Sequence, residues 1–114
     1  MSEFFFLFRG EDTHSMGYSP EKLQEYMAKW MQWIEGLQRN DQFIGAQPLM
    51  QTGRLLRENN QVVSDGGFLE GTEKISGYLL CKANDYDEAT RIAGNCPILE
   101  YGNGSVEIRE IQEA

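Results

Sequence analysis

The sequence predicts an α+β fold in which two helices pack on one face of an antiparallel sheet. Three observations support this: an apolar strand near the N-terminus, a long amphipathic helix after it, and a second half that alternates strand, short helix and strand. The order of elements is β-α-β-β-α-β with one more hairpin strand possible, which is typical of a ferredoxin-like two-layer sandwich. Its 114 residues match the usual size of one domain, so we expect a single domain over residues 1–114.

The first two elements have strong sequence marks. Glu3 to Phe8 is almost wholly apolar, as in a strand buried on both faces. Ser19-Pro20-Glu21 predicts a helix start, because serine caps free backbone N–H groups and proline suits the first helical position. Apolar residues then recur at spacings of three and four, which predicts one helical face ending near Arg39-Asn40. That face comprises Leu23, Tyr26, Met27, Trp30, Ile34 and Leu37. Trp33 and Met31 lie beside it and either pack in the core, as we expect, or contact a partner or a ligand.

The middle of the chain predicts strands joined by turns. Phe43 to Leu56 is interrupted by Pro48 and Gly53, which favours an irregular or edge strand because proline cannot donate to a central ladder. Glu58-Asn59-Asn60 predicts a turn, and Gln61 to Ser64 the second strand of a hairpin.

A glycine-rich segment follows that hairpin. Asp65-Gly66-Gly67 ends the strand, and Phe68 then either enters the apolar interior or lines a cavity.

The second half of the chain predicts a strand, a short helix and a last strand. Ile75 to Lys82 is the next strand. Asp85 caps a short helix and has Glu88 at capping-box spacing. Val106 to Ile111 alternates apolar and charged residues as the last strand.

Charge and composition exclude several classes of function. The net charge of −8 disfavours binding to nucleic acid and docking on anionic membranes. No window approaches the roughly 20 apolar residues of a membrane span, and no signal peptide is recognisable, so we expect a cytoplasmic protein. Cys81 and Cys96 belong to no metal-binding or redox motif and are expected to be reduced and buried. Phosphate-binding loops are also missing from the sequence, and no metal or cofactor is expected.

The alternation in two strands points to a homodimer. Phe4, Phe6 and Phe8 point to one side of the first strand, and Phe5 and Leu7 to the other. The strand at Ile75 to Lys82 is likewise apolar on both sides, with Tyr78 and Leu80 opposite Leu79 and Cys81. Helices cover only one face of such a sheet, so we expect the other face to pack on a second copy with two-fold symmetry. The alternative is that loops or an extra segment cover it.

The chain resembles the YCII-related family, specifically the branch named for an Asp-Gly-Pro-Phe motif. The matching residues are Asp65-Gly66-Gly67-Phe68, Ser19-Pro20-Glu21, Glu70 with Lys74, Gly77-Tyr78, Asp85 with Glu88-Ala89, Cys96-Pro97 and Val106-Glu107-Ile108-Arg109. The resemblance implies a ferredoxin-like subunit of a dimeric α+β barrel with a cleft between sheet and loops. It also implies, for some relatives, a lyase or isomerase that uses a His–Asp pair. Gly67 stands where the family has proline, and glycine loosens the turn.

Two residues are candidates for acid/base catalysis. Asp65 is either a pocket-facing base or a turn residue that accepts backbone N–H bonds. His14, the only histidine, is either at the mouth of the cleft or a solvated loop residue, and it alone has an ordinary pKa near neutrality. A His14–Asp65 dyad is the sharpest enzymatic hypothesis.

Four residues are candidates for substrate binding: Phe68, Tyr78, Glu107 and Arg109. Glu107 and Arg109 share one face of the last strand, where Arg109 either holds a carboxylate or enolate or forms a surface ion pair. The function that the resemblance implies for these candidates is a cofactor-independent lyase or isomerase acting on a small organic molecule by proton transfer beside a carbonyl. The alternative is a non-catalytic ligand-binding or interaction module of the same fold.

Overall fold

The structure is a computed structural model that describes residues 1–10, 17–65, 74–100 and 104–113, with the backbone alone for 63–65. The elements are β1 (Ser2–Arg9), α1 (Pro20–Arg39), β2 (Phe43–Pro48), β3 (Arg54–Arg57), the 3₁₀ turn η2 (Glu58–Asn60), β4 (Gln61–Asp65), β5 (Ile75–Ala83), α2 (Tyr86–Ala93), the 3₁₀ turn η4 (Pro97–Leu99) and β6 (Ser105–Glu110).

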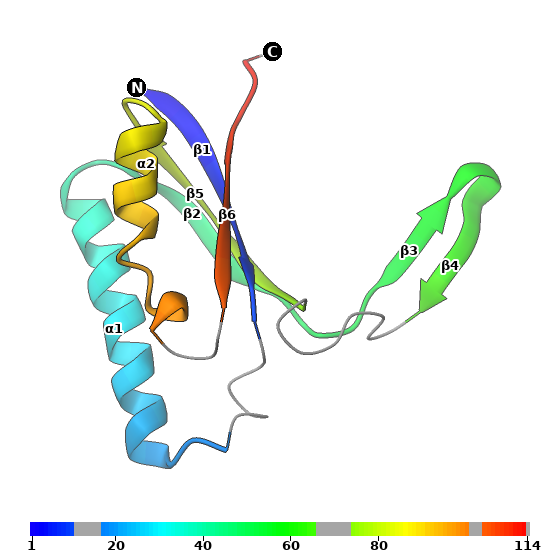
Figure 1. The fold of residues 1–114 in the computed structure, drawn as a ribbon, viewed down its shortest axis with the longest axis horizontal. Helices are drawn as coiled ribbons and strands as arrows, with labels where there is room; N and C mark the ends of the chain where they lie inside the picture. The colour runs from blue at the N-terminus through cyan, green and yellow to red at the C-terminus, as the bar shows by residue number, and fades with distance from the viewer. Residues whose placement is uncertain (11–16, 66–73, 101–103, 114) are drawn as a thin grey trace.

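Four strands form an antiparallel sheet in the order β2-β5-β1-β6. Both helices lie on one side of this sheet (Figure 1). This is the strand order of a ferredoxin-like fold, so the predicted α+β class with two helices on an antiparallel sheet is confirmed.

The core lies between the sheet and the helices. Phe4 and Phe6 are 0% exposed and Phe8 is 4% exposed on the helix side of β1, while Phe5 and Leu7 on the other side are half-buried. Leu79 and Cys81 lie beside them on β5, also fully buried. The predicted two-sided alternation of β1 and β5 is therefore confirmed.

Helix α1 begins and ends where the sequence predicts. The Ser19 hydroxyl accepts a hydrogen bond from the Lys22 backbone N–H at 3.2 Å, which caps the first turn. The expected packing of Met27 and Met31 is wrong, because these side chains are 53% and 54% exposed. Each follows a core-facing aromatic residue by one position, which turns it about 100° away from the sheet. The core-facing side chains of α1 are Tyr26, Trp30, Trp33, Ile34 and Leu37.

Helix α2 has the predicted capping box, except that Glu88 accepts from the residue before the N-cap and not from the N-cap itself. The Asp85 carboxylate accepts from the Glu88 N–H at 2.8 Å, as expected. The Glu88 carboxylate accepts from the N–H of Asn84 at 2.9 Å, one residue before the cap. Trp33 of α1 donates its indole N–H to the Ile92 carbonyl at 3.0 Å and so ties the two helices together.

The β3–β4 hairpin is a separate two-stranded sheet, which we call the arm (Arg54–Asp65). The sequence predicts one irregular strand from Phe43 to Leu56 that pairs with the next strand. Instead the structure divides it at Pro48: β2 pairs with β5 at the edge of the main sheet, and only β3 pairs with β4. Asn59 and Asn60 turn the hairpin with φ of 62° and 59°, a left-handed conformation that asparagine tolerates well. The arm stands away from the body on the side of the sheet opposite the helices (Figure 1).

Candidate functional site

The face of the main sheet turned away from the helices, which we call the open face, holds three of the predicted site residues. The register places Tyr78, Leu7 and Glu107 in one row across β5, β1 and β6, and Leu80, Phe5 and Arg109 in the next row. Side chains opposite one another in antiparallel strands have Cβ atoms about 5 Å apart. Tyr78, Glu107 and Arg109 are thus brought to one surface by strand pairing.

The aromatic part of the open face is a stacked pair. The rings of Phe5 and Tyr78 lie 5.8 Å apart between centroids, at an interplanar angle of 24°. Both residues, like Leu7 and Leu80 beside them, are half-buried. Among the described residues, no helix covers this apolar strip. It offers a flat apolar surface to a ring or to another sheet.

Beside this strip lies a charged cluster that sequence reasoning found only in part. The Glu107 carboxylate accepts a hydrogen bond from Arg9 at 2.7 Å through one oxygen and from Arg109 at 3.1 Å through the other. Arg9 was missed, although it continues the alternation of Phe5 and Leu7 along the same face of β1. That period of two was the available clue.

The two guanidinium groups keep Glu107 ionised. Hydrogen bonds from Arg9 first, and then from Arg109, lower the pKa of the Glu107 carboxyl below its ordinary value. At neutral pH the cluster therefore contains two positive groups and one negative group, a net charge of +1 on an acidic chain. Such a cluster attracts a small anion to the edge of the apolar strip.

The described residues next to the segments of His14 and Phe68 lie at the same end of the sheet. The N–H of Gly10 donates to the carbonyl of Lys74 at 2.8 Å, and the N–H of Leu49 donates to that of Ser76 at 2.9 Å. Gly10 precedes the loop with His14, and Lys74 follows the segment with Phe68. His14 and Phe68 themselves lie outside the described residues.

Asp65 is described through its backbone alone. It is the last residue of β4 and pairs with Arg54, so it lies at the base of the arm, and its side chain lies outside what the structure describes. A His14–Asp65 dyad therefore stays a prediction.

With this geometry in place, the comparisons with known proteins can be stated. A model of the YCII-related domain matches residues 4–114. The chain belongs to the YCII-related family. A search of curated proteins gives no match for this YCII-related chain.

The search of solved structures found chains similar to the YCII-related chain. One is 5-chloro-2-hydroxyhydroquinone dehydrochlorinase (TftG) from Burkholderia phenoliruptrix AC1100, in complex with 2,5-dihydroxybenzoquinone, with a TM-score of 0.54 and 12% identity over 97% of this chain and 95% of that one. Another is the de novo designed protein Ferredog-Diesel, with a TM-score of 0.42 and 8% identity over 96% and 84% of the two chains. At 12% identity the likeness to the dehydrochlorinase shows the fold.

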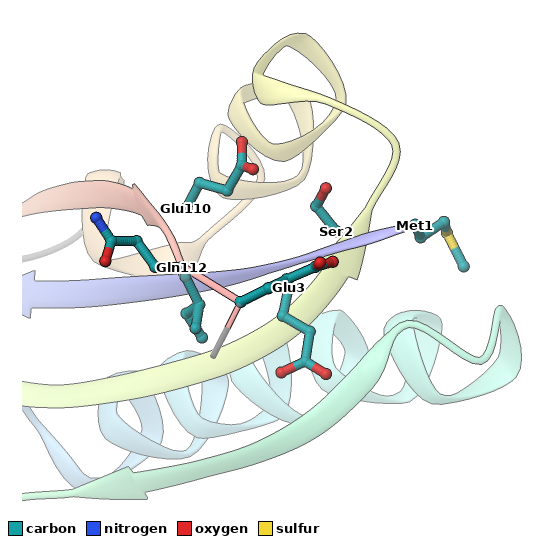
Figure 2. Close-up of a pocket in the computed structure, with 7 residues that line it drawn as sticks. Met1, Ser2, Glu3, Glu110 and Gln112 are labelled. Carbon is teal, nitrogen blue, oxygen red and sulfur yellow. The ribbon is translucent and has the colours of Figure 1, made fainter.

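The YCII-related chain also has a surface hollow of about 410 Å³ at the opposite end of β1, lined by Met1, Ser2, Glu3, Glu110, Ile111, Gln112 and Glu113. None of the predicted site residues lines it. The carboxylates of Glu3 and Glu110 point to opposite sides of the β1 ribbon (Figure 2). The hollow therefore does not gather those two carboxylates toward one reacting atom.

Three further expectations concern a metal site, a membrane span and the two cysteines. Within residues 1–10, 17–65, 74–100 and 104–113, no group of three His, Cys, Asp or Glu side chains is placed to hold a metal ion. No described helix is long and apolar enough to span a membrane. Cys81 and Cys96 are unpaired and buried, as the sequence predicts, and burial raises their pKa to about 11 and about 12. Both thiols are thus protonated and unreactive near neutral pH.

Proposed function

We propose that this YCII-related protein is a cofactor-independent lyase or isomerase that acts on a small anionic aromatic or enolic molecule. One observation carries the proposal: the Arg9–Glu107–Arg109 cluster stands beside the Phe5–Tyr78 stack on the open face. A planar ring would lie on the stacked rings while a deprotonated oxygen meets Arg109. This arrangement suits a substrate whose negative charge grows as a proton leaves a carbon beside a carbonyl.

The proposed catalytic pair is His14 with Asp65. Histidine has an ordinary pKa near neutrality, so it can take a proton and return it, and a carboxylate beside it would orient the ring. One observation supports this pair: Gly10, which precedes the segment of His14, and Lys74, which follows the segment after Asp65, are hydrogen-bonded to each other.

The proposed assembly is a homodimer in which two open faces turn toward each other as a dimeric α+β barrel, so that the substrate lies in a cavity enclosed between the two sheets. A half-buried apolar strip of this kind is unusual on the surface of a monomer. We also place the chain in the branch named for the Asp-Gly-Pro-Phe motif, with Asp65-Gly66-Gly67-Phe68 as its form of that motif.

The dehydrochlorinase of similar fold supplies a suitable probe for binding. At neutral pH 2,5-dihydroxybenzoquinone is an anion, whereas 2,5-dimethoxybenzoquinone has the same ring without the charge. We expect calorimetry to show binding of the first and not of the second. Arg109→Met and Arg9→Met should each weaken binding about tenfold or more, since each removes a charged hydrogen-bond donor. Arg91→Met, which changes an exposed arginine on α2, is the matched control and should bind normally.

Turnover needs a separate assay. Loss of one proton and one chloride from 5-chloro-2-hydroxyhydroquinone balances without an oxidant, so chloride release measures the proposed chemistry directly. We expect His14→Ala and Asp65→Ala to lower that rate strongly while binding of the quinone is kept. If the wild-type protein binds the anion but releases no chloride from this or related halogenated phenols, it is a binding module instead. If it binds neither quinone, the proposed site is wrong.

A further inference from the structure

The arm is poorly packed for part of a monomer. All side chains from Thr52 to Val62 are exposed, including Leu56 at 57% and Val62 at 49%. Leu56 and Val62 lie opposite each other across β3 and β4, so they form one apolar patch. A two-stranded hairpin alone is marginally stable in water, so the arm lacks the support that a third strand or a helix would give.

The dimensions of the chain agree with an unpacked arm. The radius of gyration is 15.5 Å, whereas a compact chain of this length has a value of about 13 Å. The arm leaves the main sheet at Pro48, the end of β2, and stands on the side that the helices leave uncovered (Figure 1). Any body that packs on the open face therefore lies next to the arm.

We propose that the arm is a clasp that holds a second copy of this chain, with Leu56 and Val62 packed against the partner. The inference rests on the proposed function for the homodimer itself, and it adds the element that completes the interface. By two-fold symmetry each copy would give one arm and receive one.

The area of the open face favours a second copy of this chain as the body that the arm holds. Four strands about 4.8 Å apart, each about six residues of 3.3 Å long, give the open face a flat footprint of about 400 Å². A stable interface buries about 800 Å² on each partner. Two exchanged arms would add apolar surface to the contact that the two sheets make.

The net charges of the arm and of the whole chain also favour a second copy. The segment Arg54–Asn60 holds two arginines and one glutamate, whereas the whole chain has a net charge of −8. The outer part of the arm thus has a net charge opposite in sign to that of the whole chain, so electrostatic steering toward a second copy is favourable.

Dimerisation measured by sedimentation equilibrium tests the clasp. The arm variant is Leu56→Asp with Val62→Asp, and Leu80→Arg disrupts the open face. Met31→Asp changes a methionine of similar exposure on α1 and is the matched control. We expect the dissociation constant to rise about tenfold or more in the arm variant, because each dimer loses two apolar patches, and to stay unchanged in the control.

The outcomes separate the clasp from the proposed dimer. If Leu80→Arg gives monomers while the arm variant dimerises like the wild type, the clasp is wrong and the sheet-to-sheet dimer stands. A wild-type protein that is monomeric at micromolar concentration overturns both.

Hydrogen exchange gives a second readout that does not depend on arm substitutions. The amides of β3 and β4 should exchange slowly in the wild-type dimer and quickly in Leu80→Arg, since the isolated hairpin lacks support. Equal exchange in the two proteins would contradict the clasp.

Discussion

Trp33→Phe is expected to destabilise the protein by breaking the link between its two helices. The Trp33 indole donates to the Ile92 carbonyl of α2 at 3.0 Å. The same ring lies 6.5 Å from Phe6, 6.1 Å from Phe8 and 5.6 Å from Trp30 between centroids. Phenylalanine keeps a ring in this cluster but has no N–H to donate, and it is smaller.

The size of the effect follows from these two losses. A hydrogen bond lost to a part-buried carbonyl costs about 1 kcal/mol. The smaller ring gives up part of the buried apolar area, which costs about 1 kcal/mol more. For 114 residues the entropy of unfolding is about 0.24 kcal/mol/K, so a loss of about 2 kcal/mol lowers Tm by about 8 °C.

Urea unfolding followed by circular dichroism measures this loss. All proteins are compared at one concentration, because association shifts apparent stability. Met31→Ala is the control on the same helix, and its exposed side chain predicts a change within about 0.5 kcal/mol. The reasoning is refuted if Trp33→Phe unfolds like the wild type, or if Met31→Ala costs as much.

Three further predictions concern protonation and backbone packing. Arg9→Met should raise the pKa of Glu107 toward its ordinary value in a carbon-13 NMR titration, because it removes the main cause of the lowered pKa. In the wild type, the stability that this carboxylate contributes is present above the pKa it has in the unfolded chain, and it is lost as the pH falls through the pKa it has in the folded chain. If Glu107 has the same pKa in the variant as in the wild type, the assignment to Arg9 is contradicted. The two thiols have pKa values raised to about 11 and about 12, so the stability they contribute declines as pH rises above their unfolded pKa; a disulfide reagent at mildly alkaline pH should react only as fast as the chain opens. Gly104→Ala would place a Cβ 2.7 Å from the Arg9 carbonyl and should cost about 1–3 kcal/mol by urea unfolding, whereas Gly45→Ala, with nothing within 4 Å, should cost less.

Local chemistry made much of the fold predictable. The start of α1 at Ser19-Pro20 and the cap of α2 at Asp85 are decided by residues within one turn, and both were predicted correctly. The alternation of Phe4 to Phe8 likewise needs only the geometry of one strand. These features depend on near neighbours, so a single sequence contains them.

Strand partners were less predictable than strand positions. The residues of β2 and β3 were recognised as strand-like, but β2 pairs with β5 across 29 to 38 positions while β3 pairs with β4 through a short turn. Pairing depends on which chains meet in space, and periodicity does not encode that. The same reason explains Met27, whose exposure depends on how wide a face of α1 the sheet covers.

The same distinction between local sequence and strand pairing applies to the candidate site. Alternation placed Glu107 and Arg109 on one face of their strand and Tyr78 on one face of its own, and the pairing register then brought all three to one surface. Arg9 and Glu107 are 98 positions apart, and their contact exists because β1 lies beside β6. When two strands pair, the side chains that alternate to the same face of each strand become neighbours. The positions of the site residues on strands can therefore be derived once the strand pairing is known. His14 and Phe68 lie outside the described residues and on no predicted strand, so no period places them, and substitution tests their roles.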